Sequence, residues 1–379
     1  MLKKSGLFAA LLIVILAAFG ALAQDAAPVI VADGLTSPRH VTIDADGNVY
    51  VAEAGNGGDL TVLDAFGSEI SAGFTSQVSS VSAEGEQSVL LGELFSRAYF
   101  GEGSYLGAHK IVATEDSYWV LLGEGAESNE IPEGTRYEAL VQLNRETLEE
   151  VQVIDLGAYE VENNPDEDPQ TIASNPVDFD VAADGTIFIV DASANSVLTW
   201  TEADGLALFA AYPLTDDAPS SVPSSVDVVD GEDGTQTVYI GFLGGFPFVR
   251  EGGSARIEVY TDGELTSTIT GVNLVTDVQF NDADGLLYVV ELADGFGNEG
   301  YIPASGRIIT VDAEGTIAPV VESLNFPYGL AMNADGQILV SVNSSFSEPG
   351  SGQVIVAEPG TSASAEPEEP AATEEGSGS

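Results

Sequence analysis

The sequence predicts an all-β chain folded as a six-bladed β-propeller, in which each blade is a four-stranded antiparallel sheet. Three observations lead to this fold class. One unit of about fifty residues recurs along the chain, the second strand of each unit is apolar at nearly every position, and no stretch of comparable length shows a helical period apart from residues 94–99 in the first insertion.

The recurring unit contains a hairpin whose turn carries an aspartate. Its clearest copies cover residues 37–53, 175–191 and 326–342, each with an Asp-Gly turn. The six turn aspartates lie 70, 68, 49, 51 and 51 residues apart, at Asp46, Asp116, Asp184, Asp233, Asp284 and Asp335. Such spacings fit four-stranded blades with insertions in the first two intervals. We predict two-residue type I′ turns at the Asp-Gly pairs, because Asp-Gly between β-branched and aromatic residues is typical of tight hairpins.

The second strand of each hairpin predicts how the blades pack. Residues 49–52 and 187–190, for example, are apolar without alternation. Both faces of such a strand must therefore be buried. A blade between two neighbouring blades meets this requirement, whereas a two-sheet sandwich with a solvent face does not.

The third strands predict how the ring closes. They follow the hairpins at residues 60–63, 140–143, 197–200, 257–260, 308–311 and 354–356. The last unit has no fourth strand, yet an apolar run at residues 29–32 precedes the first unit. We predict that this N-terminal strand completes the last blade, which removes the open edge that a ring would otherwise leave.

The two ends of the chain differ from the repeats in composition. Lys3 and Lys4 precede an apolar stretch and then Ala21-Leu22-Ala23, a small-x-small cleavage pattern. We predict a signal peptide over residues 1–23, the propeller over 24–357, and a disordered acidic tail of Pro, Glu, Ala and Ser over 358–379. The protein is therefore expected to be secreted, to a periplasm or outside the cell. An uncleaved membrane anchor is the alternative, but the apolar stretch is short for a bilayer.

Charge and cysteine content exclude several classes of function. Asp and Glu number 61 against 10 Lys and Arg, and the net charge is −51, which argues against nucleic acid and anionic membranes as partners. The absence of cysteine excludes disulfides, zinc–thiolate sites and thiol catalysis. We expect a monomer without stable membrane insertion, whose partner is a small molecule or a protein.

Candidate binding residues lie at the mouth of the central channel, the end away from the hairpin turns. Two-residue turns place His40 opposite Glu53, Lys110 opposite Gly123 and Asp178 opposite Asp191. The same count places Asp277 within about one residue of Glu291. The predicted ligand site at the mouth therefore consists of His40, Glu53, Lys110, Asp178, Asp191, Asp277 and Glu291.

Four of these acids form a candidate metal site. Carboxylates that face each other repel unless one holds a proton or a cation lies between them. Ca²⁺, a hard cation that prefers oxygen ligands, would resolve the repulsion among Asp178, Asp191, Asp277 and Glu291. The alternative is that these acids are solvated at a water-filled mouth, since chance placement is easy in a chain with 61 carboxylates.

The basic residues near the mouth allow a further interpretation. His40, His109 and Lys110 all fall at the starts of the first two blades. They could orient an anionic ligand or serve acid–base chemistry, because a histidine beside a carboxylate titrates near neutral pH. The alternative is structural, with His40 held by Glu53 and Lys110 offsetting the acids.

Several segments resemble a known family of exported proteins. The runs VADGL at 31–35, DGNVYVAE at 46–53, GFPF at 245–248 and FPYGLA at 326–331 look like the ScyD/ScyE family, which is similar to NHL-type six-bladed propellers. The resemblance covers nearly the whole chain up to the tail and implies fold and export. It supplies no catalytic motif.

Two classes of function follow from these observations. The first is a non-catalytic exported propeller that binds a ligand or partner through its channel mouth and loops. The second is a Ca²⁺-dependent hydrolase or lactonase that uses the acidic channel, which analogy with other six-bladed propellers alone supports. The first class is our expectation, so we predict no catalytic residues and no certain cofactor.

Overall fold

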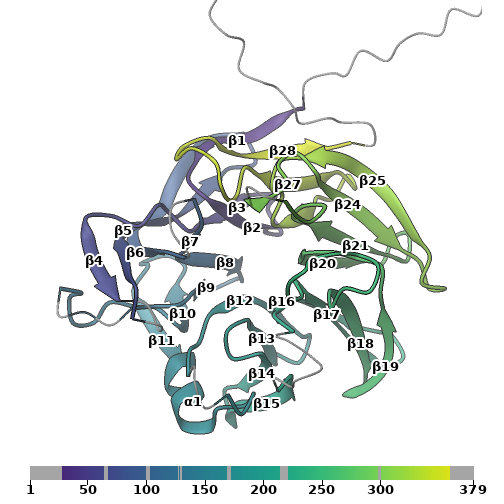
Figure 1. The fold of residues 1–379 in the computed structure, drawn as a ribbon, viewed down its shortest axis with the longest axis horizontal. Coiled ribbons are helices and arrows are strands. Elements are labelled where there is room, and N and C mark those ends of the chain that lie inside the picture. The colour runs from purple at the N-terminus through teal and green to yellow at the C-terminus, as the bar shows by residue number, and fades with distance from the viewer. Residues whose placement is uncertain are drawn as a thin grey trace, which may run out of the picture.

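Six β-sheets stand in a ring around a central channel (Figure 1). The computed structural model describes residues 28–63, 67–99, 103–126, 128, 130–168, 172–213, 221–297 and 300–358. The predicted signal peptide and residues 359–379 of the predicted tail lie outside the described residues. The arrangement confirms the six-bladed propeller of four-stranded antiparallel blades.

Blades 1 to 3 occupy the N-terminal half of the described chain. Blade 1 contains β2 (Pro38–Ile43), β3 (Val49–Glu53), β5 (Glu69–Val81) and β6 (Gln87–Ala98), with β4 (Leu60–Leu63) and β7 (Tyr105–Leu106) added to β5 and β6. Blade 2 contains β8 (Ala108–Ala113), β9 (Ser117–Leu122), β10 (Ala139–Asn144) and β11 (Glu150–Asp155). Blade 3 follows helix α1 (Leu156–Asn163) and contains β12 (Pro176–Val181), β13 (Ile187–Asp191), β14 (Ser196–Thr201) and β15 (Gly205–Ala211).

Blades 4 to 6 complete the ring. Blade 4 contains β16 (Pro223–Asp230), β17 (Gln236–Phe242), β18 (Arg256–Thr261) and β19 (Glu264–Ile269). Blade 5 contains β20 (Val275–Asn281), β21 (Leu286–Glu291), β24 (Gly306–Val311) and β25 (Ile317–Leu324), and a small hairpin of β22 (Phe296–Gly297) and β23 (Gly300–Tyr301) leaves it. Blade 6 contains β26 (Leu330–Met332), β27 (Ile338–Val342), β28 (Gly352–Ala357) and β1 (Ile30–Leu35).

The closure of the ring agrees with the sequence prediction. Strand β1 pairs antiparallel with β28, so the N-terminal strand supplies the outer strand of the last blade. The first blade differs from the prediction. Residues 60–63 do not form its third strand, because β5 pairs with β3 and β4 pairs with the first part of β5. The insertion therefore lengthens this blade outward, and residues 94–98 of it belong to strand β6 and not to a helix.

Alternate residues of each second strand enter different cores. In β3, Val49 and Val51 pack with blade 6, whereas Tyr50 and Ala52 pack with blade 2. Strand β13 behaves in the same way, with Ile187 and Ile189 in one core and Phe188 and Val190 in the next. This burial on both faces explains why the second strands are apolar at every position.

The hairpin turns of blades 1 and 3 are longer than predicted. In blade 1 the backbones of Asp44 and Asn48 bond across the turn, so three residues lie between them, and Gly47 alone of these has a left-handed φ, +84°. The turn of blade 3 repeats this geometry with Gly185 at φ +90°. Such three-residue loops combine a type I turn with one left-handed residue. The prediction of two-residue type I′ turns is therefore wrong for these hairpins.

The inner strands also carry a register shift near the mouth. Pro38, not His40, lies opposite Glu53; Lys110 lies opposite Leu121. Asp178 lies opposite Val190. The predicted pairs His40–Glu53, Lys110–Gly123 and Asp178–Asp191 are therefore wrong. Asp277 lies opposite Val290, one residue from Glu291, as predicted.

Helix α1 was not predicted from the sequence. Asp155 caps its N-terminus by accepting a hydrogen bond from the Ala158 N–H, and Asn164 ends it in a left-handed conformation. Leu156 and Tyr159 pack against the core between blades 2 and 3. Within the described ranges, the structure contains no helix of the length and apolarity that a membrane span requires.

Candidate functional site

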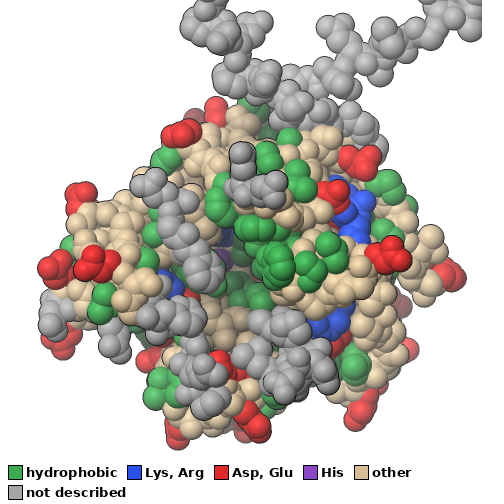
Figure 2. Space-filling model, in the orientation of Figure 1, with side chains coloured by type: hydrophobic (Ala, Val, Ile, Leu, Met, Phe, Trp, Pro, Cys, Tyr) green, Lys and Arg blue, Asp and Glu red, His purple; other side chains and the backbone are tan. Residues whose placement is uncertain are grey.

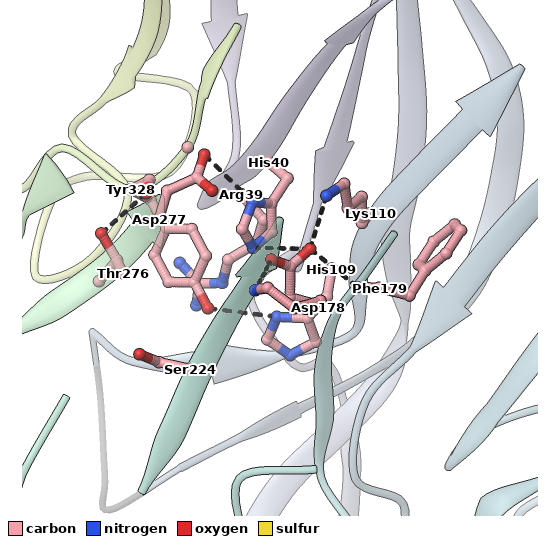
Figure 3. A network of polar contacts seen from close by, with 12 residues as sticks. Arg39, His40, His109, Lys110, Asp178, Phe179, Ser224, Thr276, Asp277 and Tyr328 are labelled. Carbon is pink, nitrogen blue, oxygen red and sulfur yellow. Dashed lines mark hydrogen bonds and ion pairs between the residues drawn. The ribbon is translucent and has the colours of Figure 1, made fainter. Parts of the chain in front are cut away.

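The residue at the register shift of each inner strand turns toward the neighbouring blade or the channel. Ser224 of β16 donates to the Val275 carbonyl of blade 5, over 2.6 Å. Thr276 of β20 donates to the Tyr328 carbonyl of blade 6, over 2.8 Å. The equivalent position in blade 2 holds His109, and in blade 1 the shift spans Arg39 and His40. The shift therefore gathers polar side chains from different blades at one level of the channel (Figure 3).

Among the acids at this level of the channel, Asp178 accepts the most hydrogen bonds. Its Oδ1 atom accepts from the Lys110 ammonium over 2.7 Å and from the Phe179 N–H over 2.8 Å. Its Oδ2 atom accepts from the Val226 N–H of blade 4 over 2.8 Å. The carboxylate is completely buried. Asp178 therefore joins three blades.

His40 lies between two buried carboxylates without a hydrogen bond to either. Its Nδ1 atom is 3.5 Å from Asp277 Oδ2, and its Nε2 atom is 3.9 Å from Asp178 Oδ1. Neither ring nitrogen has a hydrogen-bond partner among the described residues, although the side chain is 1% exposed. Asp277 Oδ2 instead accepts from the Leu330 N–H of blade 6 over 2.7 Å. The imidazole thus keeps open hydrogen-bonding positions.

Tyr328 stands at the centre of the basic side chains (Figure 3). His40 approaches the edge of its ring with centroids 5.2 Å apart, and the Arg39 guanidinium lies over the ring at 4.8 Å. The Tyr328 hydroxyl is 3.5 Å from His109 Nδ1. We call Arg39, His40, His109, Lys110, Asp178, Asp277 and Tyr328 the channel cluster.

Arg39 is buried without a carboxylate partner. Its Nη1 and Nη2 atoms donate to the Ser344 and Tyr105 carbonyls over 2.7 and 2.6 Å, and it forms no ion pair with any acid of the described residues. The Arg39 Nε and His109 Nε2 atoms have no hydrogen-bond partner in the described part of the chain. In a protein of net charge −51, this is an unusual concentration of unpaired donors.

The protonation states follow from these surroundings. Burial lowers the pKa of His109 well below its usual value, and the charges of Arg39 and His40 lower it further. Burial alone would lower the pKa of Lys110, but the nearby carboxylates, Asp178 first, raise it on balance. Burial raises the pKa of Tyr328 to about 12. At neutral pH His109 is therefore neutral, Lys110 is charged and Tyr328 keeps its proton.

Three predicted site residues belong to other networks. Glu53 accepts from the Thr36 N–H, the Gln77 amide and the Ser79 hydroxyl. Asp191 accepts hydrogen bonds from the Ser174 hydroxyl and from the N–H groups of Asn175 and Ala194. Glu291 accepts from the guanidinium groups of Arg250 and Arg307 and from the Asn273 N–H. The structure therefore brings together His40, Lys110, Asp178 and Asp277 of the predicted mouth.

The predicted metal ligands are divided by the same networks. In the described residues, the one group of His, Asp and Glu side chains close enough to share an ion is His40, Asp178 and Asp277, with ligand atoms within 4.8 Å of one another. It contains two of the four predicted acids. The Lys110 ammonium already contacts Asp178 Oδ1, and a bound cation would repel it at that oxygen. This donor set therefore suits Ca²⁺ poorly.

Exposed aromatic side chains gather beside the channel. Three loops, which follow β17, β21 and β27, supply these side chains. Phe248, after β17, has its ring centroid 6.2 Å from that of Phe246 in the same loop. The centroids of Phe296 and Tyr301, after β21, are 6.1 and 5.6 Å from that of Phe248. Phe346 continues the group at 5.7 Å from Tyr301. Phe246, Phe296 and Phe346 are 71%, 48% and 47% exposed. We call these five residues the aromatic rim.

The rim and the channel cluster are neighbours. The loop that carries Phe346 also supplies the Ser344 carbonyl that binds Arg39. Figure 2 shows apolar side chains beside the central hollow and a histidine within it. The mouth thus combines an apolar border with a polar interior, an arrangement typical of ligand sites.

Comparisons with known proteins agree with this fold. No family model and no curated protein match the chain. A gluconolactonase from Xanthomonas campestris is 10% identical with a TM-score of 0.50, and the match covers 86% of this chain and 88% of that chain. A putative oxidoreductase (glucose dehydrogenase) from Thermus thermophilus is 14% identical with a TM-score of 0.50, over 86% and 98% of the chains. Virginiamycin B lyase from Staphylococcus aureus is 12% identical with a TM-score of 0.43, over 86% and 97%. At such identities the likeness shows a six-bladed propeller and nothing about chemistry.

Proposed function

We propose that this protein is an exported, non-catalytic propeller that binds a small ligand or a partner at its channel mouth. One observation carries the proposal: buried side-chain nitrogen atoms with open hydrogen-bonding positions lie next to an exposed aromatic rim. Arg39 Nε, both ring nitrogens of His40 and His109 Nε2 are such positions. Phe246, Phe296 and Phe346 supply the apolar border.

The bonding of the channel acids supports binding more than acid–base catalysis. Asp178 and Asp277 both accept main-chain hydrogen bonds from a neighbouring blade, at Val226 and Leu330. A carboxylate held in this way has fewer free lone pairs for a substrate proton. Its role is to hold the blades and to fix the basic side chains, which is the preorganisation that binding sites need.

Membership of the ScyD/ScyE family is part of the proposal. The sequence segments that resemble this family include GFPF at 245–248, which contributes Phe246 and Phe248 to the rim, and FPYGLA at 326–331, which contributes Tyr328. The quoted segments therefore supply residues to both parts of the mouth. Export by the predicted signal peptide belongs to the same proposal.

The chemistry of the mouth describes the ligand that would fit it. The unpaired Nε–H group of Arg39 favours a ligand with hydrogen-bond acceptors. Exposed phenylalanines favour an apolar or aromatic body. A partner protein could supply the same chemistry through an aromatic side chain and a backbone carbonyl or carboxylate.

A dye titration tests the location of the site. Anilinonaphthalene sulfonate combines an aromatic body with an acceptor group, and its fluorescence reports binding. We expect Phe346→Ser to weaken its binding about tenfold, the equivalent of about 1.4 kcal/mol. The matched control is Leu265→Ser on β19, a side chain that is 52% exposed and far along blade 4 from the rim. Equal binding by wild type and Phe346→Ser would place the dye elsewhere and contradict the proposal.

A metal-dependent hydrolase or lactonase is the second candidate, because His40, Asp178 and Asp277 lie within reach of a common ion. The test is gluconolactone hydrolysis in Ca²⁺ and in chelator, with His40→Ala as the control. If the binding proposal holds, wild type and His40→Ala give the same rate in both conditions. Hydrolysis that requires both Ca²⁺ and His40 would favour the enzyme.

A further inference from the structure

Two arginines lie at the base of the small hairpin of blade 5 that carries Phe296 and Tyr301. The hairpin leaves β21 after Glu291 and returns to β24, where Arg307 lies opposite Glu291. The completely buried Glu291 accepts hydrogen bonds through Oε2 from Arg307 Nε and from Arg250 Nη2, each over 2.6 Å. One buried carboxylate therefore fixes two guanidinium groups at the mouth end of blade 5.

Hydrogen bonds join this pair of arginines to the aromatic rim. The Asn273 N–H donates to Glu291 Oε1 over 2.9 Å, and the Asn273 side-chain amide donates to the Phe248 carbonyl over 3.1 Å. Arg250 follows Phe248 by two residues and pairs through Nη1 with Asp294 at the start of the hairpin. The arginines and the rim thus belong to one connected structure.

Arg307 keeps both of its terminal nitrogen atoms open. Its side chain is 20% exposed, and only its Nε atom has a partner among the described residues. The Nη1 and Nη2 atoms are open to solvent, since neither is a buried atom without a partner. Together they form a planar fork that matches the two oxygens of a carboxylate.

This open fork distinguishes Arg307 from the other arginines of the described chain. Each of the others donates from at least one Nη atom to an acid or a carbonyl: Arg39, Arg97, Arg136, Arg145, Arg250 and Arg256. Acids number 61 in this chain, so a guanidinium that leaves both Nη atoms unpaired stands out. The fork therefore has room for an acidic group from outside the protein.

The rim next to this fork is held in a fixed position. Phe248 and Tyr301 pack against a buried core that includes Leu274 and Phe326. Figure 2 shows basic side chains at the edge of the apolar patch beside the central hollow. Rings fixed in this way can contact a flat aromatic body without a further loss of side-chain freedom.

We propose that the ligand of the mouth is an aromatic carboxylate. Its carboxylate binds the Nη1 and Nη2 atoms of Arg307, and its ring packs on the aromatic rim. This inference rests on the proposed function, because it uses the same rim, and it adds the chemical class of the ligand. The position of Arg307 is set by Glu291, so the fork is preorganised for the carboxylate.

Calorimetric titration with 2-naphthoate and with the neutral 2-naphthamide tests the proposal. We expect Arg307→Gln to weaken 2-naphthoate binding about tenfold, because the variant removes a charge-assisted bidentate pair. Binding of 2-naphthamide should change less than about twofold, because this probe carries no charge for Arg307 to pair with. The matched control is Arg136→Gln, which removes the same charge from a side chain of blade 2 that is 41% exposed. It should bind 2-naphthoate as wild type does.

A second variant keeps the test decisive if Arg307→Gln does not fold. Arg307→Lys retains a positive charge beside Glu291, but its single nitrogen atom replaces Nε and leaves no fork. We expect it to fold and to weaken 2-naphthoate binding as well. Unchanged 2-naphthoate binding in the Arg307 variants, together with weaker binding in Phe346→Ser, would keep the rim as the site and overturn the carboxylate. If wild type binds neither probe, or if Phe346→Ser binds both as wild type does, the proposed function fails together with this inference.

Discussion

Two groups of buried acids in this molecule, one in the channel and one under α1, differ in what their oxygens contact. Asp178 and Asp277 accept N–H groups from neighbouring blades, and Lys110 balances the charge of Asp178. Glu160 has no donor among the described residues, and the acids beside it bind neutral groups. One group is therefore complete within the protein, and the other is not.

The comparison shows how a site can be recognised in an acid-rich chain. With 61 carboxylates, closeness of acids alone says little. A buried polar atom without a hydrogen-bond partner is stronger evidence of a site, because a folded protein leaves few such atoms unsatisfied. By this criterion the unpaired Arg39 Nε, His40 and His109 nitrogen atoms of the channel call for a ligand with polar groups.

The largest expected effect comes from breaking the complete group. Asp178→Ala leaves Lys110 buried without its partner and leaves the Val226 N–H without an acceptor. We expect a loss of about 3–5 kcal/mol in the free energy of unfolding, the usual result of removing one partner of a buried pair. Urea unfolding measures it. Asp178→Asn keeps an acceptor for Val226 and should lose less. A loss below about 1 kcal/mol in Asp178→Ala would show that solvent already reaches this pair.

A smaller loss is expected at Asp277. In Asp277→Ala the Leu330 N–H of blade 6 loses its acceptor, but no lysine is left unpaired. We expect about 1–3 kcal/mol, the cost of one unsatisfied buried donor. The same urea experiment measures it, with Asp277→Asn as the control that retains an acceptor. If Asp277→Ala costs as much as Asp178→Ala, the hydrogen bond to the blade and not the charge pair dominates both sites.

Much of the fold was predictable from the sequence, and the reason lies in particular strands. Residues 49–52 and 187–190 are apolar because alternate side chains enter different cores. Closure by residues 29–32 followed from a missing outer strand in the last blade. Helix α1 had a signal that was not used, namely Asp155 at its N-cap.

The channel cluster was predictable only in part. A turn that is one residue longer than assumed moves the cross-strand partner of every residue in the hairpin by one position. A shift of one position puts a side chain opposite a residue that points to the other face of the sheet. The longer turn therefore places Val190, and not Asp191, opposite Asp178, and the register shift beyond Asp178 places Asp191 opposite Pro176. Arg39 and Tyr328 were missed as site residues because the predicted ring places blade 1 next to blade 6 but does not give the direction of these side chains. The glycine that follows five of the six turn aspartates was compatible with both turn lengths.

Asp227 is a third buried acid, and its effect on the free energy of unfolding depends on pH. Its Oδ2 atom accepts from the Phe280 N–H of blade 5, as in the channel cluster, but burial and the nearby charge of Asp180 raise its pKa to about 8. The folded protein therefore holds a proton that the unfolded chain has lost above its ordinary pKa of 3.8. This contribution to stability is full at low pH and is lost as pH rises toward about 8. We expect Asp227→Asn to reduce the fall in the free energy of unfolding between pH 5 and pH 8. Both pH values lie above the ordinary pKa of an aspartate, so this carboxyl is ionised in the unfolded chain throughout the range. Parallel curves for the two proteins would contradict the prediction.

The smallest effect is expected where a complete pair lies in solvent. Arg136 binds Glu150 over 3.0 Å, but their side chains are 41% and 44% exposed. Water and salt screen such a pair, so Glu150→Gln should cost about 0.2–1 kcal/mol and less at high ionic strength. Removal of one acid from a chain of net charge −51 also relieves repulsion, which reduces the cost further. Urea unfolding of wild type and variant in low and high KCl measures the loss of the ion pair together with the relief of repulsion. A cost similar to that of Asp178→Ala would mean that hydrogen-bond geometry, and not burial, decides what a carboxylate contributes in this protein.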